Sequence, residues 1–177
     1  MASDTATIAI RTARADDAAP ICAIYNHHVT DTVVTFEETP VGAAEMARRI
    51  GESAYPWLVL EDGGTLAGYA SASAWKPRAS YRHTVESSVY IDPRCQRRGH
   101  GRRLCEALLA ELRNRDVHVV LAGIALPNPA SVALHEALGF VASGVMSEVG
   151  WKLGRWVDVG YWALTLRSAR GSPPNRV

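Results

Sequence analysis

Hydrophobic and polar residues alternate along several short stretches of this chain and follow helical spacing along others. Alternation and β-branched side chains predict strands over residues 7–11, 57–60, 65–72, 84–91, 118–125, 140–149 and 156–166. Helical spacing predicts helices over residues 14–28, 41–53, 102–113 and 130–138, with Asp16 as the N-cap of the first. Because helices and strands are interspersed along the chain, the pattern predicts a mixed α/β fold.

The chain has 177 residues, a length that suits one domain able to bury roughly two-thirds of its surface. We expect this domain to occupy residues 7–167, with flexible termini at 1–6 and 168–177. No internal repeat or low-complexity stretch interrupts it.

A glycine-rich turn, Gln96–Gly101, follows the predicted strand 84–91 and precedes the helix 102–113. The first turn of a helix has unpaired N–H groups and the positive end of the macrodipole, so it attracts anions. Gly99 and Gly101 permit positive φ and a close approach of the backbone, and arginines add charge at positions 97, 98, 102 and 103. The pattern therefore predicts a pyrophosphate site.

The spacing of this turn excludes two common nucleotide loops. The Gly-Lys-Ser/Thr of nucleotide hydrolases is missing, and so is the third glycine of the dinucleotide fingerprint. The alternative that stays open for the turn alone is an ordinary helix start with solvated arginines.

A second helix start follows at Asn128. Asn128 and Ser131 occupy capping positions of the short amphipathic helix 130–138, and Gly139 ends it before a new strand. A strand, a glycine turn, a helix, and then an asparagine-capped short helix ending in Gly-Phe resemble the acetyl-CoA site of the GNAT N-acetyltransferase superfamily.

Four further segments closely resemble the phosphinothricin and methionine sulfoximine N-acetyltransferase family within that superfamily. They are Tyr25–His27, Thr35–Glu37, Trp75–Tyr90 and Gly150–Trp162. The resemblance covers nearly the whole chain, apart from the first few residues and the tail from Ser168.

The resemblance implies the GNAT fold, a central mixed, mostly antiparallel twisted sheet flanked by helices. It implies an N-acetyltransferase that takes acetyl from acetyl-CoA to the α-amino group of a small glutamate-like amino acid, such as phosphinothricin, methionine sulfoximine or methionine sulfone. Direct transfer in a ternary complex fits the absence of a supported nucleophile; a catalytic role for Cys95 has no partner motif.

The same resemblance implies the acetyl-CoA contacts. The residues are Val89, Tyr90, Ile91, Arg97, Arg98, Gly99, His100, Gly101, Arg102, Asn128 and Ser131. In the superfamily the strand that holds Val89–Ile91 splays from its neighbour at a bulge and leaves amides free for the thioester oxygen and the pantetheine arm. His100 stands where relatives usually carry an apolar residue, and we expect little consequence because the backbone binds there.

Glu86 is the candidate catalytic base. It lies inside an otherwise apolar strand, where an unpaired carboxylate is costly, and the family assigns the catalytic role to this glutamate. A carboxylate beside the acceptor can hold the ammonium and relay its proton. The alternative is a structural glutamate paired with Arg82 or Arg78.

His135 is the second catalytic candidate, at a position where most superfamily members have tyrosine. An imidazole can take the amine proton or donate to the departing thiolate, and we favour the sulfur side. The sequence does not separate base from acid, and the alternative is a solvent-exposed or capping histidine.

Substrate binding is expected to fall to Arg78, with Tyr81 and Phe36 as weaker candidates. A guanidinium suits bidentate capture of a carboxylate or phosphinate, and Arg78 lies in a predicted loop just before the strand of Glu86. Its alternative is a solvated loop arginine. Lys152 and Asp158 are placed at the pocket rim or a dimer contact.

Composition limits the partners. The net charge of +1 gives no field to hold nucleic acid or a membrane, and no apolar run approaches the roughly 20 residues of a membrane span. Three irregularly spaced cysteines form no disulfide frame, no metal-ligand cluster is present, and the N-terminus is not a secretory signal, so we expect a cytoplasmic protein without a metal. The resemblance implies a homodimer, because members of that family are commonly homodimers.

Two alternative functions remain. One is acetylation of another amine, such as a polyamine, an antibiotic or a peptide N-terminus; Arg78 argues against the polyamine. The other is a non-catalytic acetyl-CoA sensor, against which the presence of both Glu86 and His135 argues.

Overall fold

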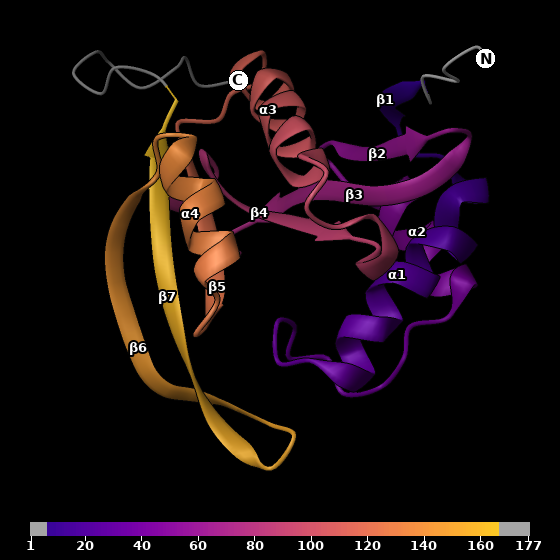
Figure 1. Ribbon diagram of the computed structural model, residues 1–177. Helices are drawn as coiled ribbons and strands as arrows, with labels where there is room; N and C mark the ends of the chain where they lie inside the picture. Colours follow the sequence, from indigo (N-terminus) through magenta and orange to yellow (C-terminus); the bar gives the residue numbers. More distant parts are fainter. Residues whose placement is uncertain (1–6, 167–177) are drawn as a thin grey trace.

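The computed structural model describes residues 7–166, and within this range seven strands form one sheet (Figure 1). The strands are β1 (Ile8–Thr12), β2 (Trp57–Asp62), β3 (Thr65–Ala74), β4 (Thr84–Ile91), β5 (Val119–Leu126), β6 (Val141–Lys152) and β7 (Arg155–Thr165). They lie in the order β1-β2-β3-β4-β5-β7-β6, and β4 with β5 is the parallel pair among antiparallel neighbours. The predicted mixed, mostly antiparallel sheet is confirmed. The termini expected to be flexible, 1–6 and 168–177, lie outside the described residues.

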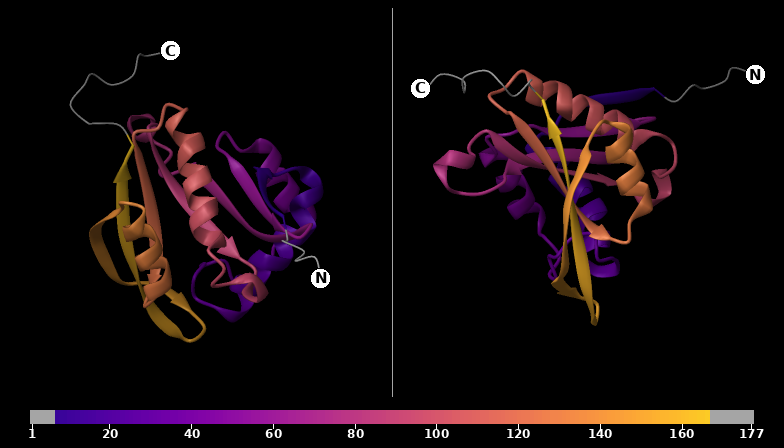
Figure 2. Two further views of the ribbon diagram at one scale, coloured as in Figure 1. Left: turned by 45° about the horizontal axis from the view of Figure 1, so that its top comes forward. Right: turned by 90° about the vertical axis from the view of Figure 1, so that its left-hand side faces the viewer.

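Helices cover both faces of the sheet (Figures 1 and 2). They are α1 (Ala18–Asp31), α2 (Ala43–Glu52), α3 (His100–Arg113) and α4 (Pro129–Ala137). The leucines of α3 pack with β-strand residues such as Val85 and Val120 in one core, and α1 and α2 pack with Val59 and Tyr69 in a second core on the other face. Side chains that alternate along β4 therefore point toward two different layers.

The predicted elements are all present, with shifts at their ends. The first helix is preceded by a 3₁₀ turn, Ala15–Asp17, and runs to Asp31 rather than His28. The expectation of Asp16 as its N-cap is wrong. Asp17 accepts a hydrogen bond from the Arg14 amide at 2.7 Å and pairs with Arg11 of β1, so these two interactions engage Asp17 and not Asp16.

The two middle strands diverge. β4 pairs with β5 only at Thr84–Glu86, opposite Val119–Leu121, although β4 continues to Ile91 and β5 to Leu126. The pairing of β4 with β3 runs on without a register shift, so the divergence occurs without the bulge that the resemblance implied. The β5 side of residues 87–91 thereby lacks a ladder partner in the described chain.

The long β6–β7 hairpin extends away from the rest of the fold (Figures 1 and 2). Near its tip the Lys152 ammonium donates to the carbonyls of Thr35, at 2.7 Å, and His28, at 3.3 Å. Lys152 is 3 % exposed, so it is a buried tie between the hairpin and the segment after α1 rather than a rim residue, and burial lowers the pKa of its ammonium.

Candidate active site

The glycine turn builds the start of α3 as the sequence predicts. Gly99 is the N-cap residue with φ 79°, and no side chain caps the helix, so the first amides of α3 are available to a ligand. The predicted positive φ at Gly101 is wrong, because α3 begins at His100 and Gly101 is already helical. Arg97 takes the second left-handed position of the turn, with φ 61°.

A cavity of about 680 Å³ lies against this turn and fills the gap between β4 and β5. Most residues predicted to bind acetyl-CoA line it: Val89, Tyr90, Ile91, Arg97, Gly99, His100, Gly101, Arg102, Asn128 and Ser131. Arg98 does not line the cavity, because its guanidinium pairs with Asp62 at 3.4 Å. Exposed glycine backbone, an uncapped helix start and two arginines fit a pyrophosphate-bearing ligand at one end of this cavity.

His100 has a more definite place than the sequence suggested. Its side chain is 2 % exposed, and its Nε2 lies 3.1 Å from Asp62 Oδ2 at the end of β2. Arg98 meets the same carboxylate. The start of α3 is thus fixed to the β2–β3 hairpin by two side chains that converge on Asp62.

The short helix α4 places His135 in the same cavity. The Asn128 side chain accepts from the Ser131 amide at 3.1 Å, so Asn128 is the N-cap and Ser131 lies in the first turn. His135 is 5 % exposed, and its Nδ1 lies 2.8 Å from the Ser131 carbonyl. A carbonyl only accepts, so Nδ1 carries the proton and Nε2 of the neutral ring keeps a lone pair. Burial lowers the pKa of His135, which favours that neutral ring.

Glu86 lies on the opposite face of β4 from Val85, as the alternation predicts, and no described residue forms a hydrogen bond or ion pair with its carboxylate. The structural alternative of a pair with Arg82 or Arg78 is therefore not observed in residues 7–166. Burial raises the pKa of the Glu86 carboxyl, which moves it closer to the range useful for a base.

Gly123 of β5 makes the room for this carboxylate. A Cβ built on Gly123 would lie 2.6 Å from Glu86 Oε1 and 3.4 Å from a ring carbon of Tyr161. Gly123 also lines the large cavity. The Glu86 carboxyl thus lies over the gap between β4 and β5, at the point where the sheet is open between its two faces.

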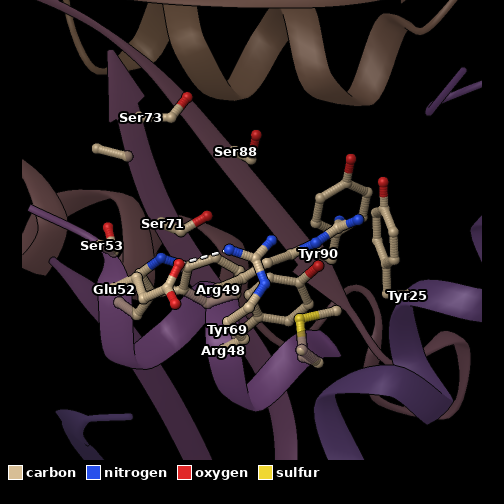
Figure 3. A pocket seen from close by; sticks show the side chains of 13 residues that line it. Tyr25, Arg48, Arg49, Glu52, Ser53, Tyr69, Ser71, Ser73, Ser88 and Tyr90 are labelled. Carbon is tan, nitrogen blue, oxygen red and sulfur yellow. Dashed lines mark hydrogen bonds and ion pairs between the residues drawn. The ribbon is translucent and has the colours of Figure 1, made fainter. Parts of the chain in front are cut away.

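A second cavity, of about 390 Å³, lies on the α1–α2 face (Figure 3). Its lining includes hydroxyls from the sheet and from α1, and charged side chains from α2: Tyr69, Tyr90, Ser71, Ser73, Ser88, Tyr25, Arg48, Arg49 and Glu52. Ser88 and Tyr90 also line the large cavity. The two cavities therefore meet at β4, two residues along the strand from Glu86.

The predicted substrate residues lie outside both linings. Arg78 is exposed in the β3–β4 connection, and Tyr81 packs edge-on against Trp75 with ring centroids 5.0 Å apart. Phe36 covers Gly150 of β6 so closely that a Cβ added there would clash with its ring. The structure does not bring these three side chains together with Glu86 in one described cavity.

Sequence reasoning missed the α2 wall of the second cavity and the role of Gly123. The strand 118–125 gave a signal for Gly123, because an isolated glycine in an apolar strand indicates a close approach. The arginines of α2 gave no such signal, because charged residues on the polar side of an amphipathic helix are typical of a solvent-exposed face.

The described residues contain neither a cluster suited to a metal ion nor a helix suited to a membrane. No cluster of three or more His, Cys, Asp or Glu side chains in residues 7–166 is placed to hold a metal ion. Nor does any helix in this range have the length and apolar character to cross a membrane.

Comparison with known proteins identifies close relatives. The sequence profile of the acetyltransferase (GNAT) family matches residues 21–140. A phosphinothricin N-acetyltransferase from Streptomyces viridochromogenes is 42% identical over 92% of this chain and 90% of its own length. An L-methionine sulfoximine/L-methionine sulfone acetyltransferase from Pseudomonas paraeruginosa is 40% identical, over 93% and 98%. The crystal structure of a phosphinothricin acetyltransferase from Sinorhizobium meliloti with acetyl-CoA aligns with a TM-score of 0.91 and 37% identity, over 98% of this chain and 95% of that one.

Proposed function

This chain belongs to the acetyltransferase (GNAT) family, and from that premise we propose that it acetylates the α-amino group of a small glutamate-like amino acid by direct transfer in a ternary complex. It is an acetyl-CoA-dependent N-acetyltransferase. One observation carries the proposal: two cavities on opposite faces of β4 meet at Ser88 and Tyr90, beside the half-buried Glu86 carboxylate, which has no described partner. Each cavity can hold one substrate while both reacting groups reach the same gap.

The large cavity is the proposed acetyl-CoA site. Its glycine turn and the α3 amides would hold the pyrophosphate, with Arg97 and Arg102 adding charge. The unpaired β5 side of Val89–Ile91 would receive the pantetheine arm and the thioester oxygen. When bound, acetyl-CoA supplies the activated acetyl group; the residues of this chain bind it and move protons.

Glu86 is the proposed general base. An ionised Glu86 attracts the acceptor ammonium and removes its proton, directly or through one water, so that the amine nitrogen gains a lone pair. Its position over Gly123 supports this role, because the carboxyl lies at the gap through which an amine on the α1–α2 face would reach the thioester.

His135 is proposed to complete the proton transfer at the sulfur side. Its neutral ring has no proton on Nε2 to give at the outset, so it must first accept one. His135 Nε2 takes the second amine proton as the new N–C bond forms, and the imidazolium returns it to sulfur as the C–S bond breaks. The lowered pKa of His135 suits a group that releases a proton readily.

Arg78 remains the proposed partner of the acceptor α-carboxylate, with Tyr81 and Phe36 as further contacts. The β3–β4 connection that carries Arg78 leaves the sheet at the Ala74–Val85 pair, next to Glu86. An exposed arginine at that end of β4 can reach a carboxylate whose amine faces Glu86.

We also propose a homodimer formed through β6. This edge strand exposes Val141, Val145, Met146 and Val149, each more than half exposed. A long exposed apolar edge favours pairing with a second copy. A cytoplasmic location is supported by the free thiols of Cys22, Cys95 and Cys105. In sedimentation, wild type should be a dimer and Val145→Lys a monomer; a wild-type monomer contradicts the proposal.

The test of function measures CoA release with acetyl-CoA and a panel of phosphinothricin, methionine sulfoximine, methionine sulfone, glutamate, spermidine and a peptide. Turnover should be confined to the amino-acid acceptors, and Glu86→Gln should lower kcat/KM by about 10²–10⁴-fold. Glu111→Gln, an exposed change on α3, is the matched control. Activity on spermidine or the peptide alone would refute the substrate class, and acetyl-CoA binding without turnover would favour the sensor.

A further inference from the structure

The carboxyl of Glu86 and the ring of Tyr161 share the space over one glycine. A Cβ built on Gly123 of β5 would lie 2.6 Å from Glu86 Oε1 and 3.4 Å from Tyr161 Cε1. Cε1 is bonded to the ring carbon that carries the hydroxyl, so the hydroxyl end of the ring is the part that approaches the glycine. The room that the missing side chain leaves is therefore shared by a carboxylate from β4 and a phenol from β7.

Strand register makes this arrangement a fixed feature of the sheet. In the β5–β7 ladder Gly123 is directly opposite Tyr161, and in the β4–β5 ladder Glu86 is opposite the residue two positions before Gly123. Directly opposed residues share a face of a sheet, and so do residues two positions apart. The chain neighbours Val85 and Trp162 pack in the core that contains the leucines of α3. Glu86, Gly123 and Tyr161 therefore lie together on the opposite face, which is the α1–α2 face.

The Tyr161 hydroxyl and the Glu86 carboxyl are complementary and unpartnered. Neither forms a hydrogen bond with any side chain or main-chain group in residues 7–166. Both side chains are half-buried, and their polar atoms are open enough for a ligand or a water to reach them. Burial and the nearby Glu86 carboxylate raise the pKa of Tyr161, which keeps its phenol protonated and able to donate. An ionised carboxylate only accepts, so the phenol supplies what it lacks.

Two other side chains of the sheet lie near Glu86. Ser73 of β3 is opposite Glu86 and is neither charged nor titratable at ordinary pH. Tyr90 lies two positions further along the same face of β4 than Ser88, and its ring is packed against the rings of Tyr25 and Tyr69, at centroid distances of 5.2 and 5.3 Å. The Tyr90 ring is thus held by its neighbours on the α1 side, away from Gly123.

The charged side chains of the α1–α2 face are engaged elsewhere. The two arginines of α2 pair with three glutamates: Arg48 with Glu45 and Glu52, and Arg49 with Glu37 and Glu45. The Lys152 ammonium donates to two main-chain carbonyls. Within the described part of the chain, none of these cations pairs with Glu86. The phenol of Tyr161 is therefore the donor placed to stabilise the negative charge of Glu86.

We propose that Tyr161 is a positioning residue for the catalytic base: its hydroxyl donates to the ionised Glu86 carboxylate, directly or through one water, and holds it over Gly123. This inference rests on the proposed function, because it takes Glu86 as the group that accepts the amine proton. One carboxylate oxygen is then fixed by the phenol, and the other faces the ammonium in a constant direction. The proton passes from the amine nitrogen to that second oxygen, and Tyr161 keeps its own proton throughout.

Tyr161→Phe tests the proposal, because it removes the hydroxyl and keeps the ring over Gly123. A donor to the charged form lowers the pKa of a carboxyl, so its loss should raise the pH at which Glu86 titrates by about 0.5–1 unit. The measurement follows the ¹³C resonance of the Glu86 carboxyl by NMR, identified by its disappearance in Glu86→Gln. An unchanged or lower midpoint overturns the proposal.

Tyr55→Phe is the matched control. The Tyr55 hydroxyl donates to the Arg82 carbonyl and lies outside both cavity linings, so its removal should leave the Glu86 midpoint unchanged. An equal shift in this control would mean that the change in Tyr161→Phe does not come from a hydroxyl beside Gly123, and it would also overturn the proposal.

The pH dependence of kcat separates a positioning role from a merely structural one. Below the Glu86 midpoint, Tyr161→Phe should lower kcat about 3–10-fold, because less of the base is ionised. The loss should shrink to less than about twofold at higher pH, where the carboxylate is ionised in both proteins. The same loss at every pH would indicate a structural role only and would overturn the proposal.

A double variant shows whether the hydroxyl acts through Glu86. Added to Glu86→Gln, Tyr161→Phe should lower kcat by less than about twofold at any pH, because no ionised carboxylate remains for the hydroxyl to hold. An equal loss in both backgrounds overturns the proposal. If Glu86→Gln alone keeps full activity, the proposed base is wrong. The NMR titration then still decides whether the Tyr161 hydroxyl holds the Glu86 carboxylate.

Discussion

The two cavities on either side of β4 differ in what lines them: one is lined partly by main chain and the other by side chains. The large cavity, proposed for acetyl-CoA, is lined at one end by main chain: the turn around Gly99, the uncapped start of α3 and the unpaired side of Val89–Ile91. The second cavity, proposed for the acceptor, is lined by side chains from β2, β3, β4, α1 and α2. A backbone site binds what all family members share, whereas a side-chain site can change its ligand by single substitutions.

Glu86 and Gly123 belong to the border between these regions. The Glu86 carboxyl lies on the α1–α2 face of β4, and Gly123, which gives it room, lines the large cavity. Changes at this border should abolish chemistry, and changes within one cavity should affect one substrate only.

After the loss of Glu86 itself, the largest expected effect comes from Gly123→Ala. The added Cβ would lie 2.6 Å from Glu86 Oε1, which must move, and the flexible carboxylate can do so without disturbing the fold. We expect kcat to fall about 10²-fold because a displaced base loses its alignment with the amine. Acetyl-CoA binding, measured by calorimetry, should stay within about twofold. An unchanged kcat would remove Glu86 from its proposed position.

The pH profile of kcat at saturating substrates separates the two proton-carrying groups. Burial raises the pKa of Glu86 above its usual value and lowers that of His135, and both groups must be unprotonated to accept a proton. Activity is therefore lost as the pH falls through these values, with a limiting slope of about two on logarithmic axes. In His135→Gln the slope should fall to about one. A slope that stays at two would mean that His135 takes no part.

Gly99→Ala should affect the cofactor side alone. Gly99 has φ 79°, a conformation that costs a residue with a Cβ about 1 kcal/mol, while nothing lies within 4 Å of the added atom. We expect the KM for acetyl-CoA to rise about tenfold as the turn relaxes. The KM for the amino acid should hold within about twofold, and a rise in that constant instead would place the turn in the acceptor site.

The smallest effect is expected for Asn128→Ala. Asn128 caps α4 by accepting from the Ser131 amide at 3.1 Å, and loss of such a cap costs about 1 kcal/mol of stability. Thermal unfolding should occur about 2–4 °C lower, and the KM for acetyl-CoA should rise a few-fold. Ser131→Ala is the control, since its amide remains. An equal loss of stability in the control would argue against capping as the cause.

The elements that form from neighbouring residues could be predicted from the sequence. β4 has the predicted bounds, Thr84–Ile91, and the turn at Gly99 and the cap at Asn128 were expected from residue types within six positions of each other. An error arose where another element intervened. Arg11 of β1 pairs with Asp17 and, across 50 positions, with Glu61, so the first helix starts differently from its own pattern of residues.

Which distant residues a side chain contacts could be known only from the folded structure. His100 reaches Asp62, Lys152 reaches Thr35 and Phe36 covers Gly150, all across more than 30 positions of sequence. That Arg78 and Tyr81 lie outside both cavity linings could not be predicted from their loop either. Such contacts depend on strand register and on how two layers pack. A short segment of sequence contains no information on either.

By itself the sequence determined the local backbone: the alternation of β4, the glycine turn that opens α3, the capped helix at Asn128 and, through resemblance, the family. The tertiary structure alone decided that Glu86 lies over Gly123, beside a cavity walled by α2. The physical reason is the sequence range over which the determining interactions act. Backbone conformation is set by sterics and hydrogen bonds over a few residues, whereas a site made of side chains exists only after separate strands and helices have packed together.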